Sequence, residues 1–559
     1  MSTKPTQKQP ETTRQRFALP DAIRVIGTTL PSEAHGREIV LEISTESRTN
    51  VSHLSLAEMG AGELKPLAAA LAEGEHFNLA KREMRGEVAK AILREVVNSK
   101  TVVVDSTGLT KLTIAGQTFT AYVWNRRVYW FGPKPEIEVI ASKRGPQARS
   151  SGKFDDWKIQ HKGVLPGNHY LIVIFAHSFA AAIRGAFCEP ELLLALVGAS
   201  TTGKSTSQNS AQAAIGHPEE VMTMSGTKIG LLDRLASKPD QPAFLQDTRQ
   251  ADSTDDLLKI IFDAADGARR IRSGESTKPI SATVILSNER NILDMPLAKK
   301  GGLDEGIFAR LLEINVNPPN GAFHHLHGEK SAADFAKKLE TIQAESYGTA
   351  WPAWLKVLSK NWQQVIELHE QRMPKVKAKI VKHAGTMGIS SINNRLLDKL
   401  TFSAWAGCIA SHYGVLPVTK DEVIDAFGLV FTEHLARQMK GMTPLGEKLI
   451  AEVRGFLDEN HGRFRDLLTF DTDTTRGSIP GYRFEIKGVG EVYLIFPSVF
   501  NRLFTVEFGN VVFSLLKDAE FLVTTPSRGN QYQARIPGTE IRKHFVAIKA
   551  SIRFDEANA

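Results

Sequence analysis

The stretch Leu192-Leu-Leu-Ala-Leu-Val-Gly198-Ala-Ser-Thr-Thr-Gly203-Lys204-Ser205 is the most informative part of this chain. A run of apolar residues enters a G-x-x-x-x-G-K-S loop, and a helix-compatible segment, residues 206–215, follows it. This order of strand, loop and helix is typical of a phosphate-binding loop. The two glycines adopt backbone angles that other residues resist, so that successive N–H groups can line a cavity for phosphate oxygens. The stretch therefore predicts binding of a nucleoside triphosphate; a glycine-rich turn that fits the pattern by chance is the alternative.

The residues of this loop have separate expected roles. Lys204 is expected to reach the β- and γ-phosphates of ATP, and the hydroxyl of Ser205 is expected to ligate Mg²⁺. The positive end of the following helix adds to the attraction for phosphate. ATP and Mg²⁺ are therefore the predicted cofactors. The residues predicted to contact the nucleotide are Gly198, Ala199, Ser200, Thr201, Thr202, Gly203, Lys204, Ser205 and Thr206.

Length and composition limit the class of protein. A chain of 559 residues is too long for one hydrophobic core, and about three or four domains are expected. The formal charge of +7 suits a polyanionic partner, although many soluble proteins carry a similar excess. The two cysteines, Cys188 and Cys408, stand in apolar sequence, so neither a disulfide framework nor a zinc site is expected.

The sequence also bears on membranes. Residues 1–16 are polar and contain no apolar core, so no signal peptide is expected there. The longest apolar run, Tyr170 to Ala182, is interrupted by His177 and follows His169, and it is predicted to be too short to span a bilayer. We therefore expect a cytoplasmic protein without membrane contact.

Composition and periodicity predict an α/β fold class with several domains. Residues 1–17 are expected to form a disordered tail, 18–145 an N-terminal α/β module, 146–320 a P-loop ATPase core, and 321–442 a helical region. Residues 443–559 are expected to form a winged-helix-like C-terminal domain. Within the first module, helical periodicity occurs in residues 64–71 and 80–97, and strand-like alternation in 101–105 and 119–124.

A short apolar strand downstream of the loop ends in an acid. This strand is Pro242-Ala-Phe-Leu-Gln-Asp247, and Asp247 is expected to hold Mg²⁺ through water as a Walker B residue. ATPases of this class commonly place a glutamate next to polarise the attacking water, but here Thr248 follows. The nearest other acids are Asp252 and Asp255, and Asp252 is the better placed if the loop turns back. The alternative is that Asp247 caps the strand end.

A second buried strand, residues 282–288, ends in an amide. Asn288 is expected to orient water and the γ-phosphate as a sensor 1 residue, and a turn-forming asparagine is the alternative. Further on, Arg310 precedes a β-like run and is suited to reach the γ-phosphate of an adjacent protomer as an arginine finger. Arg395 is a candidate second sensor on a helix; a surface helix arginine is the alternative.

Basic residues occur in two places that suit DNA. Between the two strands, the segment Asp266–Lys278 has the position of the presensor hairpin of ring-shaped helicases, and its basic residues are predicted to bind phosphate regardless of base sequence. A solvated loop, or arginines that bind the ATP of a neighbour, is the alternative. The basic residues of this segment are Arg269, Arg270, Arg272 and Lys278.

The C-terminal region predicts a winged helix. An amphipathic helix is expected over Gly446–Asn460 with Leu449, Ile450, Val453 and Phe456 on one face, followed by helices at 498–503 and 510–518. The segment that follows predicts a hairpin that turns at Arg528-Gly-Asn530. Its basic residues are predicted to contact DNA phosphate, with protein contacts as the alternative; they are Arg528, Arg535, Arg542 and Lys543. The basic and apolar residues 375–382 predict a solvated helix face rather than a DNA site.

In order and spacing these motifs resemble the bacterial predicted helicases of mobile genetic elements that are filed as a domain of unknown function. Relatives of that family include the self-loading helicases of cassette chromosomes and the minichromosome maintenance helicases. The likeness begins at Gly152-Lys-Phe-Asp-Asp-Trp157-Lys and passes through the loop, Thr227-Lys-Ile-Gly-Leu, the strand ending at Asp247 and the basic segment ending at Gly274. It resumes at Phe323-His-His-Leu-His-Gly328 with Ala333-Asp-Phe, and at Tyr347-Gly-Thr-Ala-Trp-Pro-Ala-Trp.

The resemblance implies a hexameric AAA+ ATPase that moves along DNA. Thr248 departs from the family, which commonly has glutamate at that position. Because loss of a general base typically lowers the rate by about 10²–10⁴-fold, slow hydrolysis with intact nucleotide binding is expected.

Three hypotheses for function follow. The leading one is an ATP-dependent DNA helicase or translocase, a ring-shaped homo-hexamer that acts on single-stranded or forked DNA in replication of a mobile element, with a replication initiator or loader protein as partner. The second is a slow AAA+ switch or scaffold that assembles on DNA or a protein without unwinding, which Thr248 favours. The third is a regulatory or defence protein that senses foreign nucleic acid, for which the sequence offers no effector nuclease motif.

Overall fold

The computed structural model describes the chain in two compact units. The described residues are 19, 22–30, 36–44, 49–55, 57, 59, 64, 67, 82–144, 147–224, 227–246, 254–267, 279–289, 291–292, 309–316, 319–385, 389, 391–439, 444–468, 479–503, 512–513, 515–517, 519–525, 530–535 and 542–554. Those up to Ala148, together with Leu355–Gln363, form the first unit. The other described residues form the second.

The first unit contains two sheets. One has the strand order β3-β2-β1-β4-β8, in which β1, β2 and β3 pair antiparallel while β1–β4 and β4–β8 pair parallel. The other is an antiparallel sheet with the order β5-β6-β7. The strands are β1 (Ile23–Thr29), β2 (Glu38–Ser44), β3 (Thr49–Ser55), β4 (Val102–Val104), β5 (Gly108–Ile114), β6 (Gln117–Trp124), β7 (Arg127–Trp130) and β8 (Val139–Ala141).

Helix α3 (Arg82–Asn98) completes the core of the first unit. Its Val88 and Ile92 are fully buried against apolar residues of β2 such as Leu41. The helix predicted over residues 80–97 and the strands predicted over 101–105 and 119–124 are therefore confirmed by α3, β4 and β6. Of the helix predicted over 64–71, the described residues are the buried Leu64 and Leu67; the others lie outside the described part.

The second unit is built around a parallel sheet with the strand order β10-β11-β12-β9-β13. The strands are β9 (Leu193–Val197), β10 (Met222–Thr223), β11 (Pro242–Gln246), β12 (Thr283–Asn288) and β13 (Leu311–Asn315). Strands β9, β11, β12 and β13 are almost continuously buried. Such unbroken apolar runs are characteristic of parallel strands that are covered on both faces.

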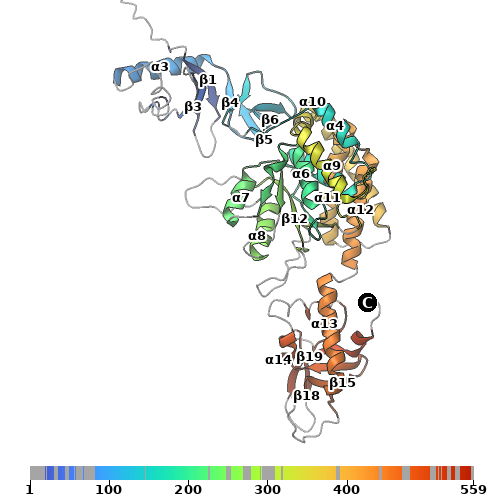
Figure 1. The fold of residues 1–559 in the computed structure, drawn as a ribbon. Coiled ribbons are helices and arrows are strands. Elements are labelled where there is room, and N and C mark those ends of the chain that lie inside the picture. Colours follow the sequence, from blue (N-terminus) through green and yellow to red (C-terminus); the bar gives the residue numbers. More distant parts are fainter. Residues whose placement is uncertain are drawn as a thin grey trace, which may run out of the picture. The chain divides into compact units, whose positions relative to one another are not determined.

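Helices cover both faces of this sheet (Figure 1). Helices α7 (Lys228–Ala236) and α8 (Thr254–Ala265) pack on one face, in a cluster that includes Leu193, Ala195 and Val197 of β9. Because successive strand residues point to opposite faces, Leu194 and Leu196 point to the other one. Helices α5 (His169–Arg184) and α6 (Lys204–Ala213) contact β11 and β12. Short elements nearby are α4 (Phe154–Lys162), η1 (Gly185–Phe187) and η2 (Pro218–Glu220).

The sheet is followed by a helical region. Its helices are α9 (Ala332–Glu345), α10 (Ala350–Ala384), α11 (Ser391–His412) and α12 (Lys420–Met439). Helices α11 and α12 contact each other, and both contact α5. The structure is thus a mixed α/β fold with a parallel sheet and a helical region.

Helix α5 corrects one expectation from the sequence. Together with η1, residues His169–Phe187 are long and apolar enough, by length and composition alone, to cross a membrane. The sequence predicts a run that His169 and His177 break and that is too short to span a bilayer, but both residues belong to the helix, and His177 is fully buried in it. Most of this segment is packed inside the protein, where it forms the helix against which α11 and α12 pack. Burial of this kind is what the core helix of a globular domain requires.

The C-terminal part has its own sheet, with the order β14-β15-β16-β19-β17 and with β18 also paired to β19. Its elements are α13 (Pro444–Asn460), η5 (His461–Arg463), β14 (Arg465–Asp466), β15 (Gly481–Ile486), β16 (Gly490–Ile495), α14 (Pro497–Leu503), β17 (Leu522–Val523), β18 (Tyr532–Arg535), β19 (Arg542–Lys549) and η6 (Ala550–Arg553). Helix α13 buries Ile450, Val453 and Leu457 against this sheet. The helices predicted over 446–460 and 498–503 are confirmed, and the one over 510–518 is described at 512–513 and 515–517.

The segment predicted to turn at Arg528 is closed by a backbone bond of 3.1 Å from the amide of Thr525 to the carbonyl oxygen of Gln531, but its two flanking strands are not paired as a simple hairpin. Strands β17 and β18 flank that segment, but in the described ladders each of them pairs antiparallel with β19. Leu522 faces Ile548 and Tyr532 faces Phe545, so the two short strands follow one another along the same partner. A local turn signal is weaker than the long-range burial of β19, whose Phe545 and Ile548 are fully buried. Arg528 itself lies outside the described residues.

Candidate nucleotide-binding site

The glycine loop, residues 198–205, lies at the carboxyl edge of the parallel sheet. Strand β9 ends at Val197, and α6 begins at Lys204 after Gly203, which has a φ of 84°. A Cβ added at Gly198 would lie 2.5 Å from the carbonyl oxygen of Val316, and one at Gly203 would lie 2.7 Å from the ring of Phe323. Both positions therefore exclude a side chain, the second by its φ as well. The loop predicted from the sequence has the geometry that its glycines require.

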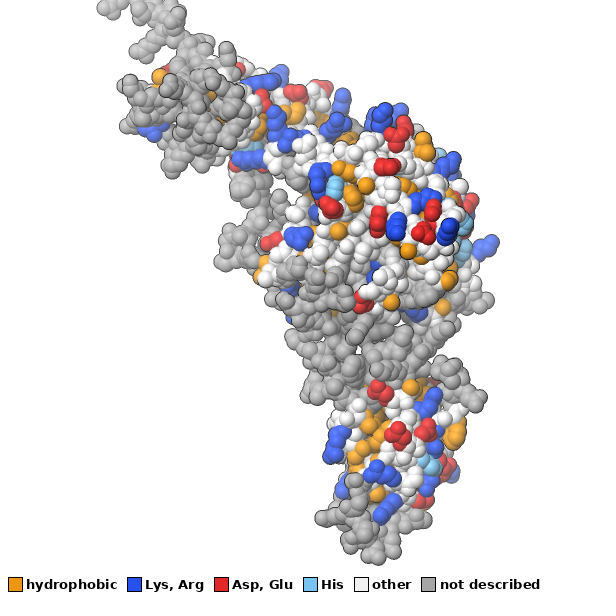
Figure 2. Space-filling model, in the orientation of Figure 1, with side chains coloured by type: hydrophobic (Ala, Val, Ile, Leu, Met, Phe, Trp, Pro, Cys, Tyr) orange, Lys and Arg blue, Asp and Glu red, His pale blue; other side chains and the backbone are white. Residues whose placement is uncertain are grey.

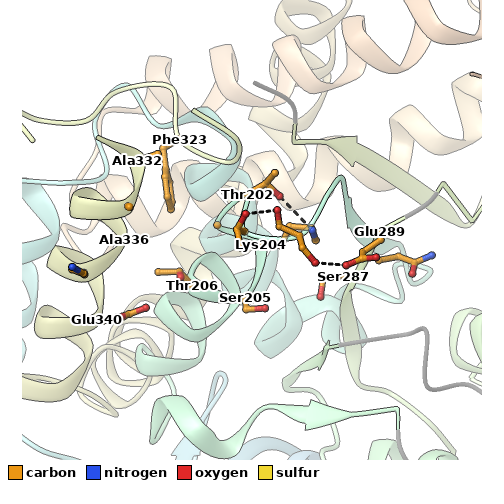
Figure 3. A pocket seen from close by; sticks show the side chains of 16 residues that line it. Thr202, Lys204, Ser205, Thr206, Ser287, Glu289, Phe323, Ala332, Ala336 and Glu340 are labelled. Atoms are coloured by element: carbon orange, nitrogen blue, oxygen red, sulfur yellow. Dashed lines mark hydrogen bonds between the residues drawn. The ribbon is translucent and has the colours of Figure 1, made fainter. Parts of the chain in front are cut away.

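Lys204 is held inside this loop (Figure 3). Its Nζ donates to the carbonyl oxygens of Gly198 and Ala199, at 2.6 Å each, and to Oγ1 of Thr202 at 3.3 Å. Only 9% of the residue is exposed. Because bonds from a cation to carbonyl oxygens are strong, the ammonium group draws the loop backbone around itself. A phosphate oxygen that enters the loop would compete with these carbonyls for the same ammonium group.

A cavity of about 560 Å³ opens beside the loop. Its volume lies in the range of sites for small molecules. Figure 3 shows that Ser287 and Glu289 line one end, and that Phe323 and helix α9 line the other. The side chain of Ser205 is exposed to this space, where a hydroxyl suits Mg²⁺. The lining residues are Ser200, Thr201, Thr202, Gly203, Lys204, Ser205, Thr206, Ser287, Asn288, Glu289, Phe323, Ala332, Ala333, Ala336, Lys337 and Glu340.

Strand β12 brings Asn288 next to the loop. Asn288 faces Val197 in the parallel ladder, and its carbonyl oxygen accepts a bond of 3.2 Å from the amide of Gly198. The next residue, Glu289, was missed in the sequence, although it directly follows the predicted sensor. The hydroxyl of Ser200 donates to its carboxylate. The structure thus places an amide and a carboxylate at the same end of the cavity.

Strand β11 is confirmed as far as Gln246. The amide of Gln246 donates to Asn209 at 2.7 Å and to the carbonyl oxygen of Ser205 at 3.4 Å, so this strand ends beside the first turn of α6. The predicted Walker B residue, Asp247, comes next in the sequence. Asp247, Thr248 and Asp252 lie outside the described residues, and nothing is described of the side chain of Asp255.

The segment 319–325 contacts the glycine loop. The amide of Ala322 donates to the carbonyl oxygen of Thr202 at 2.8 Å, and a Cβ at Gly321 would lie 2.3 Å from that oxygen. The ring of Phe323 packs edge-on against Phe335 of α9 with 5.0 Å between ring centres. The motif that begins at Phe323 therefore positions a ring against Gly203. Sequence reasoning recognised this motif without a role for it.

One buried side chain holds this segment. Asn168, fully buried, accepts bonds of 2.9 Å from the amides of His324 and His325, and its own amide donates to the carbonyl oxygens of His325 and Val164. Burial also lowers the pKa of His324 to about 4, with a further contribution from His169. The side chain of His324 is therefore neutral at physiological pH, and the bonds of its backbone do not depend on titration.

We expect Asn168→Ala to lower the free energy of unfolding by about 3 kcal/mol, because several buried backbone groups lose their partner. Calorimetric unfolding should show a lower transition temperature. Asn501→Ala, at an exposed position of α14, is the matched control and should leave the transition unchanged. Equal transition temperatures for the two variants would contradict the role of Asn168.

Arg310 and Arg395 lie together, at the amino edge of the sheet rather than at the glycine loop. The carbonyl oxygen of Arg310 accepts from the amide of Leu193, where β9 begins. A strand of this length separates that edge from the loop by roughly 16 Å. The guanidinium of Arg310 bonds Asp266 at 2.8 Å and lies over the ring of Phe262. Both arginines line a second cavity, of about 320 Å³. Its lining residues are Pro190, Ala265, Asp266, Ala309, Arg310, Arg395, Asp398 and Lys399.

Lys399 adds a third cation that the sequence analysis did not single out. Burial, followed by the charges of Arg310, Arg184 and Arg395, lowers its pKa to about 8. Its Nζ donates to the carbonyl oxygen of Glu191 at 2.9 Å. Cations crowded in this way favour the entry of an anion, which would relieve their mutual repulsion. Lys399 follows Arg395 by four residues on the same helix, and this spacing, which places the two side chains on one face, is the sequence signal that could have identified Lys399.

The predicted DNA contacts are described only in part. Arg269, Arg270, Arg272, Lys278 and Arg528 lie outside the described residues. Arg535 faces Arg542 across the β18–β19 pair, beside Lys543. Like charges directly opposite one another on a sheet are unfavourable. Over the face shown in Figure 2, Lys and Arg side chains are interspersed with Asp and Glu.

Protein side chains could also bind a metal ion without a nucleotide. Among the residues that the structure describes, no group of three or more His, Cys, Asp or Glu side chains is arranged to hold a metal ion. A Mg²⁺ ion at the loop would instead take one hydroxyl from the protein and its other oxygens from phosphate and water.

Comparisons with known proteins bear on the fold. The family model described as "Domain of unknown function (DUF927)" matches residues 3–278. No curated protein matches the sequence. Among solved structures 23 chains match. One of them, titled "SCCmec type IV Cch - active helicase", has a TM-score of 0.65 at 16% identity, with 95% of this chain and 94% of that chain covered.

The fold, a parallel sheet with the glycine loop at its edge followed by a helical region, is thus similar to that of a solved helicase. The resemblance expected from the sequence is thus confirmed at low sequence identity, to a domain of unknown function over residues 3–278 and, in fold, to the solved helicase of a cassette chromosome.

Proposed function

We propose that this protein is an ATP-dependent DNA helicase or translocase with an AAA+ P-loop core, and that it works as a ring-shaped homo-hexamer in the replication of a mobile genetic element. The observation that carries the proposal is the glycine loop around Lys204 with a cavity of about 560 Å³ beside it. ATP with Mg²⁺ supplies the phosphoryl group that is transferred to water. A cytoplasmic location, where DNA and ATP are available, goes with this function.

The cavity divides into a phosphate end and a base end. Residues 198–206, with their N–H groups at the start of α6, would hold the phosphates. Ser205 would hold Mg²⁺ directly, and Asp247 would hold it through water. Asn288, at the tip of β12, would orient water and the γ-phosphate. At the other end, Phe323 and the alanines of α9 offer apolar surface to a base.

The position of Arg310 supports a role for this residue at the ATP site of a neighbouring subunit. It lies at the edge of the sheet opposite the loop of its own chain, in a cavity that Arg395 and Lys399 also line. We propose that this edge meets the glycine loop of the next protomer, so that Arg310 acts as the arginine finger and Arg395 as a second sensor. Cations delivered from another chain make hydrolysis depend on assembly.

DNA would be held by two sets of basic residues. The segment with Arg269, Arg270, Arg272 and Lys278 would lie in the channel of the ring and bind backbone phosphate. The C-terminal domain, proposed to act as a winged helix, would add Arg528 and Arg535. The paired positions of Arg535 and Arg542 support a phosphate contact there.

One experiment tests the proposal as a whole. The mass of the protein is measured with and without single-stranded DNA and a non-hydrolysable ATP analogue, and ATP turnover and strand displacement on a forked duplex are then followed. A nucleotide-dependent hexamer whose turnover rises with single-stranded DNA, and which displaces the strand, supports the motor. A species that remains a monomer, or that ignores ATP, contradicts it.

The second candidate function is a slow nucleotide-gated switch or scaffold, which Thr248 favours. Glu289 bears on this choice, because its carboxylate lies at the cavity and is bonded by Ser200 of the loop. We propose that Glu289 supplies the carboxylate that polarises the attacking water in place of a glutamate at position 248. ATP hydrolysis fast enough for a helicase is then compatible with Thr248.

We expect Glu289→Gln to lower ATP turnover by about 10²-fold while it leaves binding intact, because the amide cannot accept a proton. Single-turnover hydrolysis and binding of a fluorescent ATP analogue measure the two effects. Glu340→Gln, at the other acid among the described residues that line the cavity, is the control and should hydrolyse ATP at the normal rate. Normal turnover in Glu289→Gln would leave the role of base to another acid, or favour the switch.

A further inference from the structure

A separate cavity of about 410 Å³ lies between helices α10, α11 and α12, away from the glycine loop. Its floor is apolar. Val376 comes from α10, Trp405 and Ile409 come from α11, and Ile424 comes from α12, and all four are buried. Cys408 is part of the same floor, and burial raises the pKa of its thiol to about 12. No step of ATP binding or hydrolysis proposed above uses this cavity.

The rim of the cavity is cationic. Its exposed charged or titratable residues are Arg372, Lys375, Lys379, His412, Lys420 and Asp421. On α10, residues 368, 372, 375, 376 and 379 recur at helical spacing, so that they share one face. Lys375 and Lys379 are exposed, as the sequence predicted for this helix face, and they also border a cavity that the sequence did not reveal.

The acids around the rim are already engaged. Asp421, the one carboxylate among the described lining residues, bonds Lys379 at 2.9 Å. Just outside, Asp398 bonds Lys377 at 2.5 Å and Asp425 bonds His383 at 3.1 Å. Arg372, Lys375 and Lys420 therefore leave an excess of positive charge around an apolar floor.

An apolar floor within a cationic rim favours one kind of ligand. An apolar pocket in a cationic rim is complementary to a peptide whose acidic residues stand next to a bulky apolar side chain. The volume accommodates a small ligand or an anchoring side chain. Single-stranded DNA fits less well, because its bases need an exposed aromatic face on which to stack, and the ring of Trp405 is fully buried.

We propose that this cavity docks an acidic peptide segment of a partner protein, with an apolar anchor in the floor and carboxylates on the rim. Such a contact would tether another protein to the helical region without occupying the ATP site. The site is independent of the proposed motor function and would stand if that function failed.

The test uses the full chain and a fluorescein-labelled peptide of consecutive aspartates that ends in leucine and phenylalanine. Anisotropy should show binding that weakens as salt is raised. The same peptide with serines in place of leucine and phenylalanine, and one with lysines in place of the aspartates, should bind much more weakly. Oligothymidine is titrated in parallel.

The variant Arg372→Glu/Lys375→Glu should bind the acidic peptide about tenfold more weakly or worse, since two attractive charges become repulsive. Lys360→Glu/Lys382→Glu makes the same charge change on α10 outside the cavity lining, and it should bind normally. Circular dichroism verifies that both variants are folded. Equal affinity of the two variants, or of the acidic and serine peptides, overturns the proposal. Rim-dependent binding of oligothymidine without peptide binding overturns it in favour of DNA.

Discussion

Lys204→Ala is expected to abolish ATP binding, with a loss of affinity of about 10²-fold or more. Charge-assisted hydrogen bonds to phosphate contribute about 1.5–3 kcal/mol each, and alanine removes them together with the positive charge. The loop itself also changes, because the carbonyl oxygens of Gly198 and Ala199 lose the ammonium group that holds them. Titration with a fluorescent ATP analogue measures the effect.

Lys162→Ala, at an exposed position of α4, is the control for loss of a lysine and should bind the analogue normally. Circular dichroism should show that both variants retain their helices, because Lys204 lies at the start of α6 rather than in its core. An unchanged affinity in Lys204→Ala would mean that the nucleotide does not use this loop, and the motor interpretation would fail with it.

Arg310→Ala is expected to spare ATP binding and to reduce hydrolysis by about 10³-fold or more, the effect of removing an arginine finger. The geometry supports this separation, because Arg310 lies at the amino edge of the sheet, roughly 16 Å from the loop of its own chain. In one subunit it bonds Asp266. Arg502→Ala, at an exposed position of α14, is the control and should leave turnover unchanged.

A mixing experiment distinguishes a finger from a structural arginine. Subunits with Arg310→Ala keep a competent loop, and subunits with Lys204→Ala keep the finger. A mixture of the two should therefore regain part of the turnover that each lacks alone, because some interfaces combine an intact loop with an intact Arg310. No recovery in mixed assemblies, or normal turnover in assembled Arg310→Ala, would refute a role in trans.

The local sequence pattern was sufficient to predict some strands and helices but not others. Strands β9, β11 and β12 could be predicted because a run of apolar residues bounded by polar ones is buried wherever the chain places it. The pairing of β17 and β18 with β19 could not, because turn chemistry describes a few consecutive residues while strand partners are chosen by burial across the sheet. The apolar segment at α5 is longer than the run seen in the sequence, because the helix continues past Ala182 and η1 follows it up to Phe187.

The candidate site shows the same division. Its loop is consecutive in sequence, so that roles for the glycines, Lys204 and Ser205 could be predicted from the sequence alone. Glu289, Phe323 and the alanines of α9 reach the same cavity from positions far along the chain. Their separation in the sequence does not tell how far apart they lie in space.

By itself the sequence determined that a glycine loop follows an apolar strand, because these residues are consecutive. It also determined the resemblance to helicases, because the order and spacing of motifs can be seen without a structure. Only the tertiary structure decided that Arg310, Arg395 and Lys399 share one cavity at the opposite edge of the sheet, and that three helices enclose an apolar pocket with a basic rim. Those arrangements depend on the packing of elements that are distant in the chain, where hydrophobic burial rather than local preference selects the neighbours.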